Sequence, residues 1–229
     1  MKTEKICLLV IAVLFVNLLP AQNIKLSETQ FVPIGSEMSI VSYKGKKCVK
    51  VERRSDIKGA DMPTYAKVKN IDFKNGTIKV SVLSKIQKNA GPRARGFIGV
   101  SFRINDDDSK FENIYLRPAN ARAEDQLRRN HSIQYFSYPD FKFNVLRKEF
   151  PGKYESYADM TLDEWIEMVI VVKDEQAKLY LNGAKHPCLI VNDLKHGTDS
   201  SGAIGLFAGI GTEGYFTDLK IESFKDFKD

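Results

Sequence analysis

The segment from Leu116 to Tyr135, LRPANARAEDQLRRNHSIQY, concentrates the side chains of this chain that could do chemistry. It holds four arginines, one histidine, two carboxylates and two asparagines, and it lies between two runs typical of β-strands. Arginine and amide groups donate hydrogen bonds in fixed geometry to hydroxyls and carboxylates, and a tyrosine ring offers an apolar face to a sugar ring. These residue types therefore indicate a site for a sugar or a carboxylated sugar.

The candidate residues divide into two roles. Those expected to bind a ligand are Arg117, Asn120, Arg122, Asp125, Arg128, Arg129, Gln134, Tyr135 and Tyr154. If the site is catalytic, His131 or Glu155 is the expected general acid or base. In that case Arg128 or Arg129 would hold an anion or a hydroxyl group.

A purely structural interpretation competes with this one. Asn120 could cap a short helix from Ala121 to Arg129, with ion pairs between residues four positions apart. The expected pairs are Glu124 with Arg128 and Asp125 with Arg129. Surface pairs contribute only about 0.2–1 kcal/mol, and they leave Arg117, Arg122 and His131 without a role. A strand would follow, with His131, Ile133 and Tyr135 on one face.

The elements that must position these residues are short alternating strands. Met38–Tyr43 and Lys47–Glu52 flank Lys44-Gly45-Lys46 and predict a hairpin. Tyr65–Phe73 and Thr77–Leu83 flank Asn75-Gly76, which predicts a second hairpin. Further strands are expected at 96–103, 111–116, 132–138, 163–172, 178–182, 189–191, 202–210 and 215–221. This spacing predicts an all-β, antiparallel jelly-roll sandwich with one short helix or loop insertion around 120–130.

The amino terminus has the pattern of an export signal. Met1–Lys5 is basic, Ile6–Leu19 is apolar, and Ala21 is a small residue suited to cleavage. A retained membrane anchor is the alternative, although this apolar run is shorter than the roughly 20 residues that span a bilayer. We therefore predict a signal peptide at 1–21 and a single domain at 22–229, in a secreted or periplasmic protein that is not membrane-embedded after cleavage.

Charge, cysteines and acidic runs limit the possible partners. The net charge of +6 is spread along the chain, and no aromatic-interleaved basic strand is present, so we expect no nucleic-acid partner.

Cys48 and Cys188 could form a disulfide in an oxidising compartment or remain buried thiols. Asn105–Asp108 could bind calcium but is more typical of a solvated turn. No zinc, haem, flavin or nucleotide motif is evident, so we expect no cofactor. The oligomeric state is left open.

The carboxyl-terminal half resembles the concanavalin A-like lectin/glucanase superfamily, including its LamG-like members. The resemblance rests on Asp163–Val172, which carries Trp165, on Gln176–Gly183 with its Tyr-x-Asn-Gly turn, and on Gly202–Phe207 and Tyr215–Ile221. It covers roughly residues 38–224 and implies a sandwich with Trp165 in the core. The superfamily includes lectins, hydrolases and adhesion modules, so the fold alone does not assign an activity.

Two enzyme families of this fold have motifs that can be sought in this sequence. Laminarinase-like glucanases carry a Glu-x-Asp-x-x-Glu motif on one strand, and the nearest match here, Asp163–Glu167, has Ile166 where the aspartate would stand. Ile114-Tyr-Leu-Arg117 loosely resembles a strand of the 3-keto-disaccharide hydrolase domains, whose Phe-Asn-Gly-Lys pattern is missing. We therefore expect an exported protein that interacts with carbohydrate as a glycan-binding module. The alternatives are a 3-keto-disaccharide hydrolase type of enzyme acting on small or acidic sugars, and a plain adhesion role.

Overall fold

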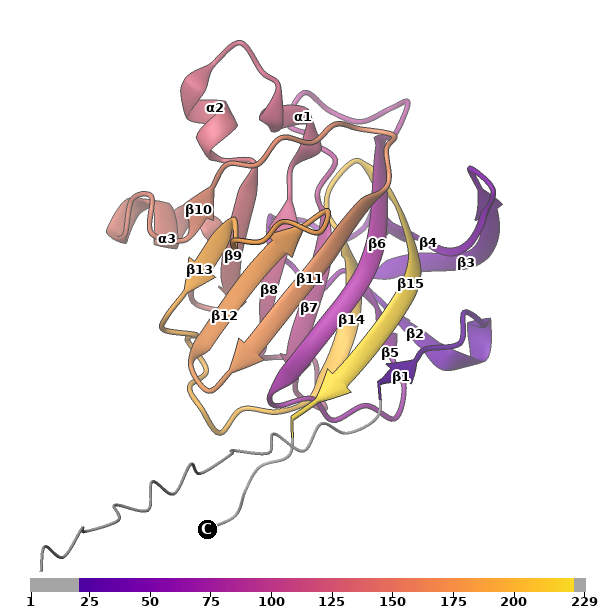
Figure 1. The fold of residues 1–229 in the computed structure, drawn as a ribbon. Helices are drawn as coiled ribbons and strands as arrows, with labels where there is room; N and C mark the ends of the chain where they lie inside the picture. Colours follow the sequence, from indigo (N-terminus) through magenta and orange to yellow (C-terminus); the bar gives the residue numbers. More distant parts are fainter. Residues whose placement is uncertain (1–20, 225–229) are drawn as a thin grey trace, which may run out of the picture.

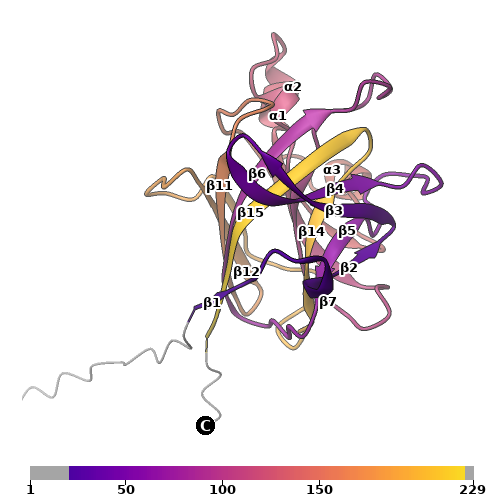
Figure 2. The same ribbon diagram turned by 90° about the vertical axis from the view of Figure 1, so that its right-hand side faces the viewer.

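The structure is a computed structural model that describes residues 21–224. Two twisted antiparallel sheets lie face to face (Figures 1 and 2). The signal peptide predicted at 1–21 lies outside the described residues except for Ala21. In the order in which neighbours pair, the first sheet consists of β13 (Leu189–Val191), β12 (Gln176–Leu181), β11 (Ile166–Lys173), β6 (Gly76–Ile86), β15 (Thr212–Ser223), β4 (Lys46–Arg53) and β3 (Ser36–Tyr43), with β1 (Gln22–Asn23) on β15.

The second sheet consists of β10 (Glu155–Ser156), β9 (Ile133–Tyr138), β8 (Phe111–Leu116), β7 (Ile98–Ile104), β14 (Ala203–Ala208), β5 (Tyr65–Val68) and β2 (Phe31–Ile34). The helices are η1 (Glu28–Gln30), α1 (Pro118–Ala121), α2 (Gln126–Asn130) and α3 (Phe143–Glu149). The loops of the second sheet carry α1 and α2 at one end of the sandwich and α3 beside β10 (Figure 1). The predicted all-β, antiparallel jelly-roll sandwich is confirmed. The sequence did not indicate β2, β10 or α3.

The core lies between the sheets, where alternate residues of each strand are apolar. In β6 the buried Ile78, Val80 and Val82 alternate with more exposed polar side chains, as expected for a strand with one solvated face. A Cβ on Gly214 of β15 would lie 3.4 Å from Ile98 Cδ1 and 3.2 Å from Ala208 Cβ, so these two residues of the second sheet face the first.

The other face of the second sheet is also buried. Register places Tyr115 opposite Gly99 and Gln134, on the face turned away from the first sheet. Aromatic rings cover this outer face, and Tyr115 packs against Phe97, Phe136 and Phe207 with ring centroids 5.7–5.9 Å apart. Loops and α3 lie over these rings. A pocket can therefore form on this outer face without exposing the core that lies between the two sheets.

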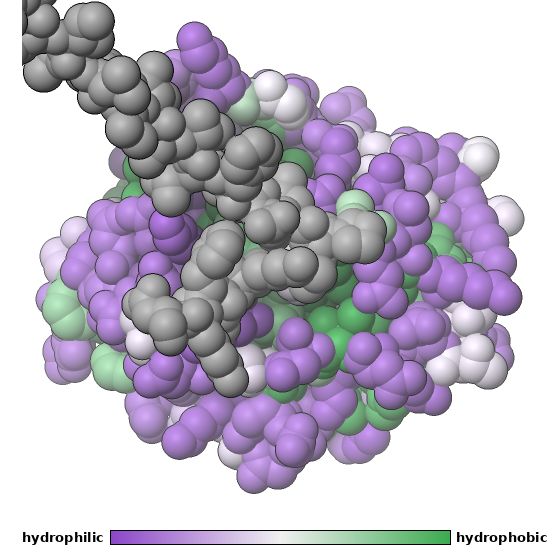
Figure 3. Space-filling model, turned by 60° about the horizontal axis from the view of Figure 1, so that its bottom comes forward, coloured by the Kyte–Doolittle hydropathy of each residue, from purple (hydrophilic) through white to green (hydrophobic). Residues whose placement is uncertain are grey.

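The opposite end of the molecule differs in character from this helical end. Figure 3 looks toward the end of the sandwich away from α1 and α2, where hydrophilic residues dominate and hydrophobic ones show between them.

The first predicted hairpin is confirmed. Tyr43 of β3 pairs with Lys46 of β4, so Lys44 and Gly45 form a two-residue turn. Both have positive φ angles, 45° and 76°, as the turns that match strand twist require.

The second predicted hairpin is wrong, because β5 and β6 belong to different sheets. The Asn75 carboxamide is buried, and its Oδ1 accepts hydrogen bonds from the Asp174 backbone N–H at 2.8 Å and from Arg103 Nη2 at 3.2 Å. Gly76 then starts β6 in close contact with the Glu222 carbonyl of β15. Asn75-Gly76 therefore joins the two sheets and does not reverse the chain within one of them.

The insertion around 120–130 is present, but its single helix is replaced by two short ones. Pro118 starts α1, and Asp125, instead of Asn120, caps α2 by accepting the Arg128 backbone N–H at 2.7 Å. Neither of the two expected ion pairs, Glu124 with Arg128 or Asp125 with Arg129, forms among the described residues. The Asp125 carboxylate binds a backbone N–H, and Arg128 and Arg129 form hydrogen bonds with other residues.

The structure corrects the prediction for Trp165 and decides between the two alternatives left open for the cysteines. Trp165 is only half-buried and packs with Cys48, Leu83 and Tyr215 in a small cluster outside the main core, with Lys46 Nζ 5.3 Å from its ring centroid. Cys48 and Cys188 are both free thiols. Cys48 lies on β4, whereas Cys188 adjoins β12, and three strands separate these two in the first sheet. At about 4.8 Å per strand, roughly 20 Å separates the cysteines, too far for a disulfide.

Candidate functional site

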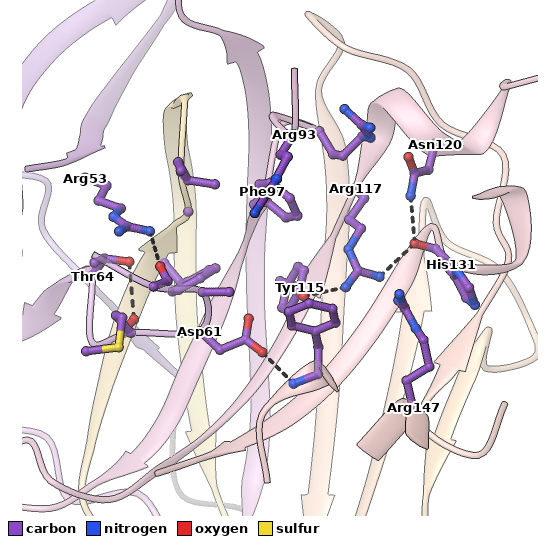
Figure 4. A pocket seen from close by; sticks show the side chains of 18 of the residues that line it. Arg53, Asp61, Thr64, Arg93, Phe97, Tyr115, Arg117, Asn120, His131 and Arg147 are labelled. Carbon is purple, nitrogen blue, oxygen red and sulfur yellow. Dashed lines mark hydrogen bonds between the residues drawn. The ribbon is translucent and has the colours of Figure 1, made fainter. Parts of the chain in front are cut away.

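A cavity of about 430 Å³ opens on the outer face of the second sheet, beside the start of α1 (Figure 4). Its volume falls within the range of about 300–1,000 Å³ typical of small-molecule sites. Four stretches of chain line it: the loop after β4, the loop before β7, the segment from β8 to His131, and α3. Phe207, Gly209 and Ile210 at the end of β14 complete the wall.

Arginine dominates the polar lining. Six arginines border the cavity: Arg53, Arg93, Arg95, Arg117, Arg128 and Arg147. Four of them have no carboxylate partner among the described residues. Arg53 and Arg95 donate only to backbone carbonyls, Arg128 reaches the Asn120 Oδ1 at 3.5 Å, and Arg93 is exposed. The cavity therefore has a positive potential that an anion would relieve.

The mutual repulsion of these arginines is visible at Arg95. Burial lowers the pKa of its guanidinium group, and the charges of Arg128 and Arg117 lower it further. Side chains from the loop before β7, from β8 and from α2 thus bring like charges close together. Such an arrangement costs free energy in the unliganded protein, which favours binding of a negative group between them.

Arg117 lies at the base of the cavity and is firmly held. Its Nη1 donates to the His131 carbonyl at 2.9 Å, and its Nη2 donates to Tyr115 Oη at 2.6 Å and to Gln134 Oε1 at 3.1 Å (Figure 4). Its guanidinium carbon is 4.9 Å from the Tyr115 ring centroid and 5.8 Å from that of Phe143. Aromatic rings therefore lie close enough to this guanidinium group for cation–π contact.

Glu155 is the buried counter-ion of this cluster. One of its oxygens lies 3.3 Å from Arg117 Nη1, and the other lies 3.0 Å from Arg147 Nε and 3.4 Å from His131 Nε2. Arg147 Nη2 donates a second bond to the same carboxylate. The Glu155 side chain is only 3% exposed, and it does not line the cavity. Its oxygens are occupied by cations, so this geometry suits a structural role better than the general acid or base role expected of it.

His131 does line the cavity. It follows the last residue of α2 and precedes β9, so it does not share a strand face with Ile133 and Tyr135 as expected. Burial lowers the pKa of its imidazole, and Arg147 and Arg117 lower it further, against the raising effect of Glu155. The ring is therefore neutral at neutral pH and can accept or donate a hydrogen bond.

Asp61 is the one carboxylate among the described residues that line the cavity, and no sequence pattern had pointed to it. It is buried, has a φ of 49°, and accepts the Phe143 backbone N–H at 2.7 Å through Oδ2 (Figure 4). Burial raises its pKa to about 6, although the Phe143 N–H and the charge of Arg117 favour the ionised form. A lone aspartate in a loop carries no periodic or motif signal.

Four of the predicted site residues are brought together at the cavity: Arg117, Asn120, Arg128 and His131. The Asn120 Nδ2 donates to the His131 carbonyl at 3.2 Å, which ties α1 to the start of β9. The predicted segment thus supplies one wall. Four further arginines come from other parts of the chain and were not predicted: Arg53, Arg93, Arg95 and Arg147.

The other predicted binding residues point elsewhere. Arg122 pairs with Asp159 at 2.7 Å on the surface, and Arg129 donates to Tyr157 Oη at 3.1 Å. Asp125 caps α2, and Gln134 is buried beneath Arg117.

Two predicted tyrosines also lie outside the cavity lining. Tyr135 faces the interior of the sandwich, where its hydroxyl donates to Glu112 at 2.7 Å. Tyr154 donates to Asp193 at 2.6 Å. Their rings pack against each other, with centroids 5.4 Å apart. Both tyrosines therefore stabilise the neighbouring structure without reaching the cavity.

The acidic turn at Asn105–Asp108 is occupied by protein partners. Asp107 accepts from the Ser109 hydroxyl at 2.6 Å, and Asp108 forms an ion pair with Lys67 at 2.8 Å and accepts from Tyr65 Oη at 2.8 Å. Within residues 21–224, no group of three or more histidine, cysteine or acidic side chains is arranged to hold a metal ion. No helix within that range is long and apolar enough to cross a membrane.

No protein-family model and no curated protein sequence matches this chain. Solved structures do. The carbohydrate-binding module CBM66 from Bacillus subtilis has a TM-score of 0.55 and 12% identity over 90% of this chain and 98% of its own. A Bacillus subtilis protein of unknown function with a galectin-like fold has a TM-score of 0.54 and 11% identity over 91% and 97%. The carbohydrate recognition domain of Emp46p has a TM-score of 0.51 and 11% identity over 85% and 88%. The chain therefore has the concanavalin A-like sandwich fold.

Proposed function

We propose that this protein binds an acidic glycan, with a carboxylated or sulfated sugar unit held in the arginine-lined cavity. The observation that carries the proposal is the gathering of six arginines on one cavity, four of them without a carboxylate partner among the described residues. Arginine binds carboxylate groups, and tetrahedral oxyanions such as sulfate, through pairs of parallel hydrogen bonds, so such a cluster favours an anion over a neutral ligand.

The apolar part of the lining suits a sugar ring. Phe97, Tyr115, Phe143 and Phe207 border the same cavity. Aromatic faces pack on the C–H faces of sugar rings, whereas an inorganic anion makes no use of them. The carbohydrate-binding names of two similar structures support the same ligand class. The apolar amino-terminal segment in turn supports export, to a compartment where a glycan would be met.

Binding is favoured over hydrolysis by the number of carboxylates. Most glycoside hydrolases use two carboxyl groups on either side of the bond to be broken. Among the described residues that line the cavity only Asp61 carries one, because Glu155 lies behind the lining and is bonded to Arg117, Arg147 and His131.

A hydrolase of the 3-keto-disaccharide type remains the second candidate. The observation in its favour is the presence of Asp61, with a pKa of about 6, and of a neutral His131 on one cavity. A carboxyl group with a pKa of about 6 can exchange protons near neutral pH. Release of reducing sugar from acidic and 3-keto disaccharides would identify this activity, and its absence together with tight binding supports the module.

The proposal is tested by calorimetry with acidic sugars and their neutral counterparts. Suitable pairs are D-galacturonate with D-galactose, D-glucuronate with D-glucose, and galactose 6-sulfate with galactose. At least one acidic sugar should bind about tenfold or more tightly than its partner, which corresponds to about 1.4 kcal/mol. Equal binding within every pair, or no binding of any acidic sugar, would refute the proposal.

A matched pair of arginine variants locates the site. Arg128→Gln removes a cavity charge, whereas Arg122→Gln removes a charge from the same insertion that pairs with Asp159 outside the cavity. We expect Arg128→Gln to weaken binding of the acidic sugar several-fold and Arg122→Gln to leave it unchanged. Equal effects of the two variants would place the site elsewhere.

A further inference from the structure

A second groove, with a volume of about 510 Å³, adjoins the arginine-lined cavity. The two share Arg53, Gly59 and Ile210 as lining residues, so they are contiguous. From there the second groove continues between the loop after β4 and the loop after β6. Ile210 stands at the junction with 47% of its surface exposed, so its apolar side chain is accessible from both hollows.

The second groove is built from restrained backbone. The turn between β14 and β15 forms part of it, and Gly211, with a φ of +64°, packs so closely that an added Cβ would lie 2.8 Å from Ala90 Cβ. The Gln87 N–H donates to the Gly211 carbonyl at 3.0 Å. On the other side Arg53 donates to the Gly59 carbonyl at 2.7 Å and to that of Ile57. The groove is thus preformed, which limits the entropy lost on binding.

The polar lining of this groove differs from that of the cavity. Acidic groups stand among its cations: Glu52 pairs with Lys50 at 2.7 Å, and Arg54 pairs with Asp56. Lys58 Nζ donates to the Ser55 carbonyl at 2.7 Å. The side chains of Glu37 and Asn89 are exposed, and neither is hydrogen-bonded to another described residue. Such carboxylate and amide groups can bind the hydroxyls of a neutral sugar. Because Glu37 and Glu52 belong to its lining, this groove is less positive than the cavity and attracts an anion less strongly.

We propose that the ligand is an oligosaccharide of at least two units, with its acidic unit in the arginine-lined cavity and a neutral unit in the adjoining groove. Ile210 would lie against the apolar face of the ligand where the two units join, and Arg53 would border both. This inference rests on the proposed function, because it takes the acidic unit in the cavity as its starting point.

Calorimetry on the protein tests the inference with two sets of probes. The first is a uronate monosaccharide, D-galacturonate or D-glucuronate. The second is a panel of disaccharides in which that uronate is linked to galactose, glucose or rhamnose. We expect at least one disaccharide to bind tenfold or more tightly than its monosaccharide. Asn89→Ala should reduce this advantage to less than threefold without changing monosaccharide affinity, since Asn89 lines only the second groove.

Asn192→Ala is the control, because Asn192 is also exposed but lies next to β13, in neither groove. It should change neither affinity, and thermal unfolding should show both variants to be folded. If the monosaccharide binds but no disaccharide binds more tightly, the inference fails and the proposed function stands. An advantage that persists in Asn89→Ala also overturns the inference. If no acidic probe binds at all, the proposed function fails first.

Discussion

Glu155 shows how one side chain can organise a site without lining it. Its carboxylate binds Arg117 and Arg147 and lies within 3.4 Å of His131 Nε2. Arg117 in turn contacts Tyr115 and Gln134. Each of these groups is oriented by its partners, so the cavity wall is rigid before any ligand arrives.

Glu155→Gln should destabilise the protein by about 3–5 kcal/mol, because it leaves two partly buried guanidinium groups without their anion. Urea unfolding measures this loss. Asp159→Asn is the matched control, since Asp159 also pairs with an arginine but is exposed, and it should cost less than about 1 kcal/mol. If Glu155→Gln abolished a sugar-hydrolysing activity while stability stayed at the wild-type value, Glu155 would instead be catalytic.

If the protein binds an acidic sugar as proposed, Asp61 should make that binding depend on pH. With a pKa of about 6 it is ionised at pH 7.5 and mostly neutral at pH 5, whereas a sugar carboxylate, with a pKa of about 3.5, stays ionised. Lowering the pH thus removes the one negative charge of the lining. Affinity for a uronate should rise several-fold from pH 7.5 to pH 5, measured by calorimetry.

Asp61→Asn separates this effect from others. The carboxamide keeps an acceptor for the Phe143 N–H but cannot ionise. The variant should bind uronate more tightly than wild type at pH 7.5 and show a smaller pH dependence. A pH dependence equal to that of wild type would exclude Asp61 as the titrating group.

Among the structural elements, the positions of strands were easier to predict than which strands pair with each other. The alternation in β6, β11 and β15 is visible in the sequence because each has one solvated face. Asn75-Gly76 has the composition of a hairpin turn, yet it joins two sheets, because the buried Asn75 amide binds Arg103 and the Asp174 backbone. Those partners lie 28 and 99 residues away, so no local pattern could reveal them.

The close packing of Gly76 between two strands can be tested by comparison with Gly183, which also follows an asparagine. At Gly76 a Cβ would lie 2.0 Å from the Glu222 carbonyl oxygen, whereas at Gly183 it would meet open space, and both have positive φ angles of 152° and 72°. Gly183→Ala should cost about 1 kcal/mol from backbone conformation alone. Gly76→Ala should cost clearly more in chemical unfolding, because β6 must also move away from β15. Equal losses would contradict the close packing of these strands.

At the scale of the whole molecule, stability comes from the two packed sheets without a disulfide. Burial raises the pKa of the Cys188 thiol to about 11 and also raises that of Cys48, so both should react slowly with iodoacetamide while the protein is folded. In protein produced without residues 1–21, denaturation without reductant should expose two alkylatable thiols, counted by mass spectrometry. Alkylation that required prior reduction would show a bond between them.

The sequence by itself determined most of the strands, the antiparallel sandwich and the segment that forms one wall of the cavity. Arg117, Asn120, Arg128 and His131 could be selected because they lie within one polar segment between two strands. Only the tertiary structure decided which of the nearby polar residues face the cavity, and it turned Arg122, Arg129 and Tyr135 away from it. It also brought in Arg53, Asp61, Arg95 and Arg147 from loops and a helix far apart in the chain. Sheet pairing and loop packing are long-range contacts, and local hydrophobic periodicity carries no information about them.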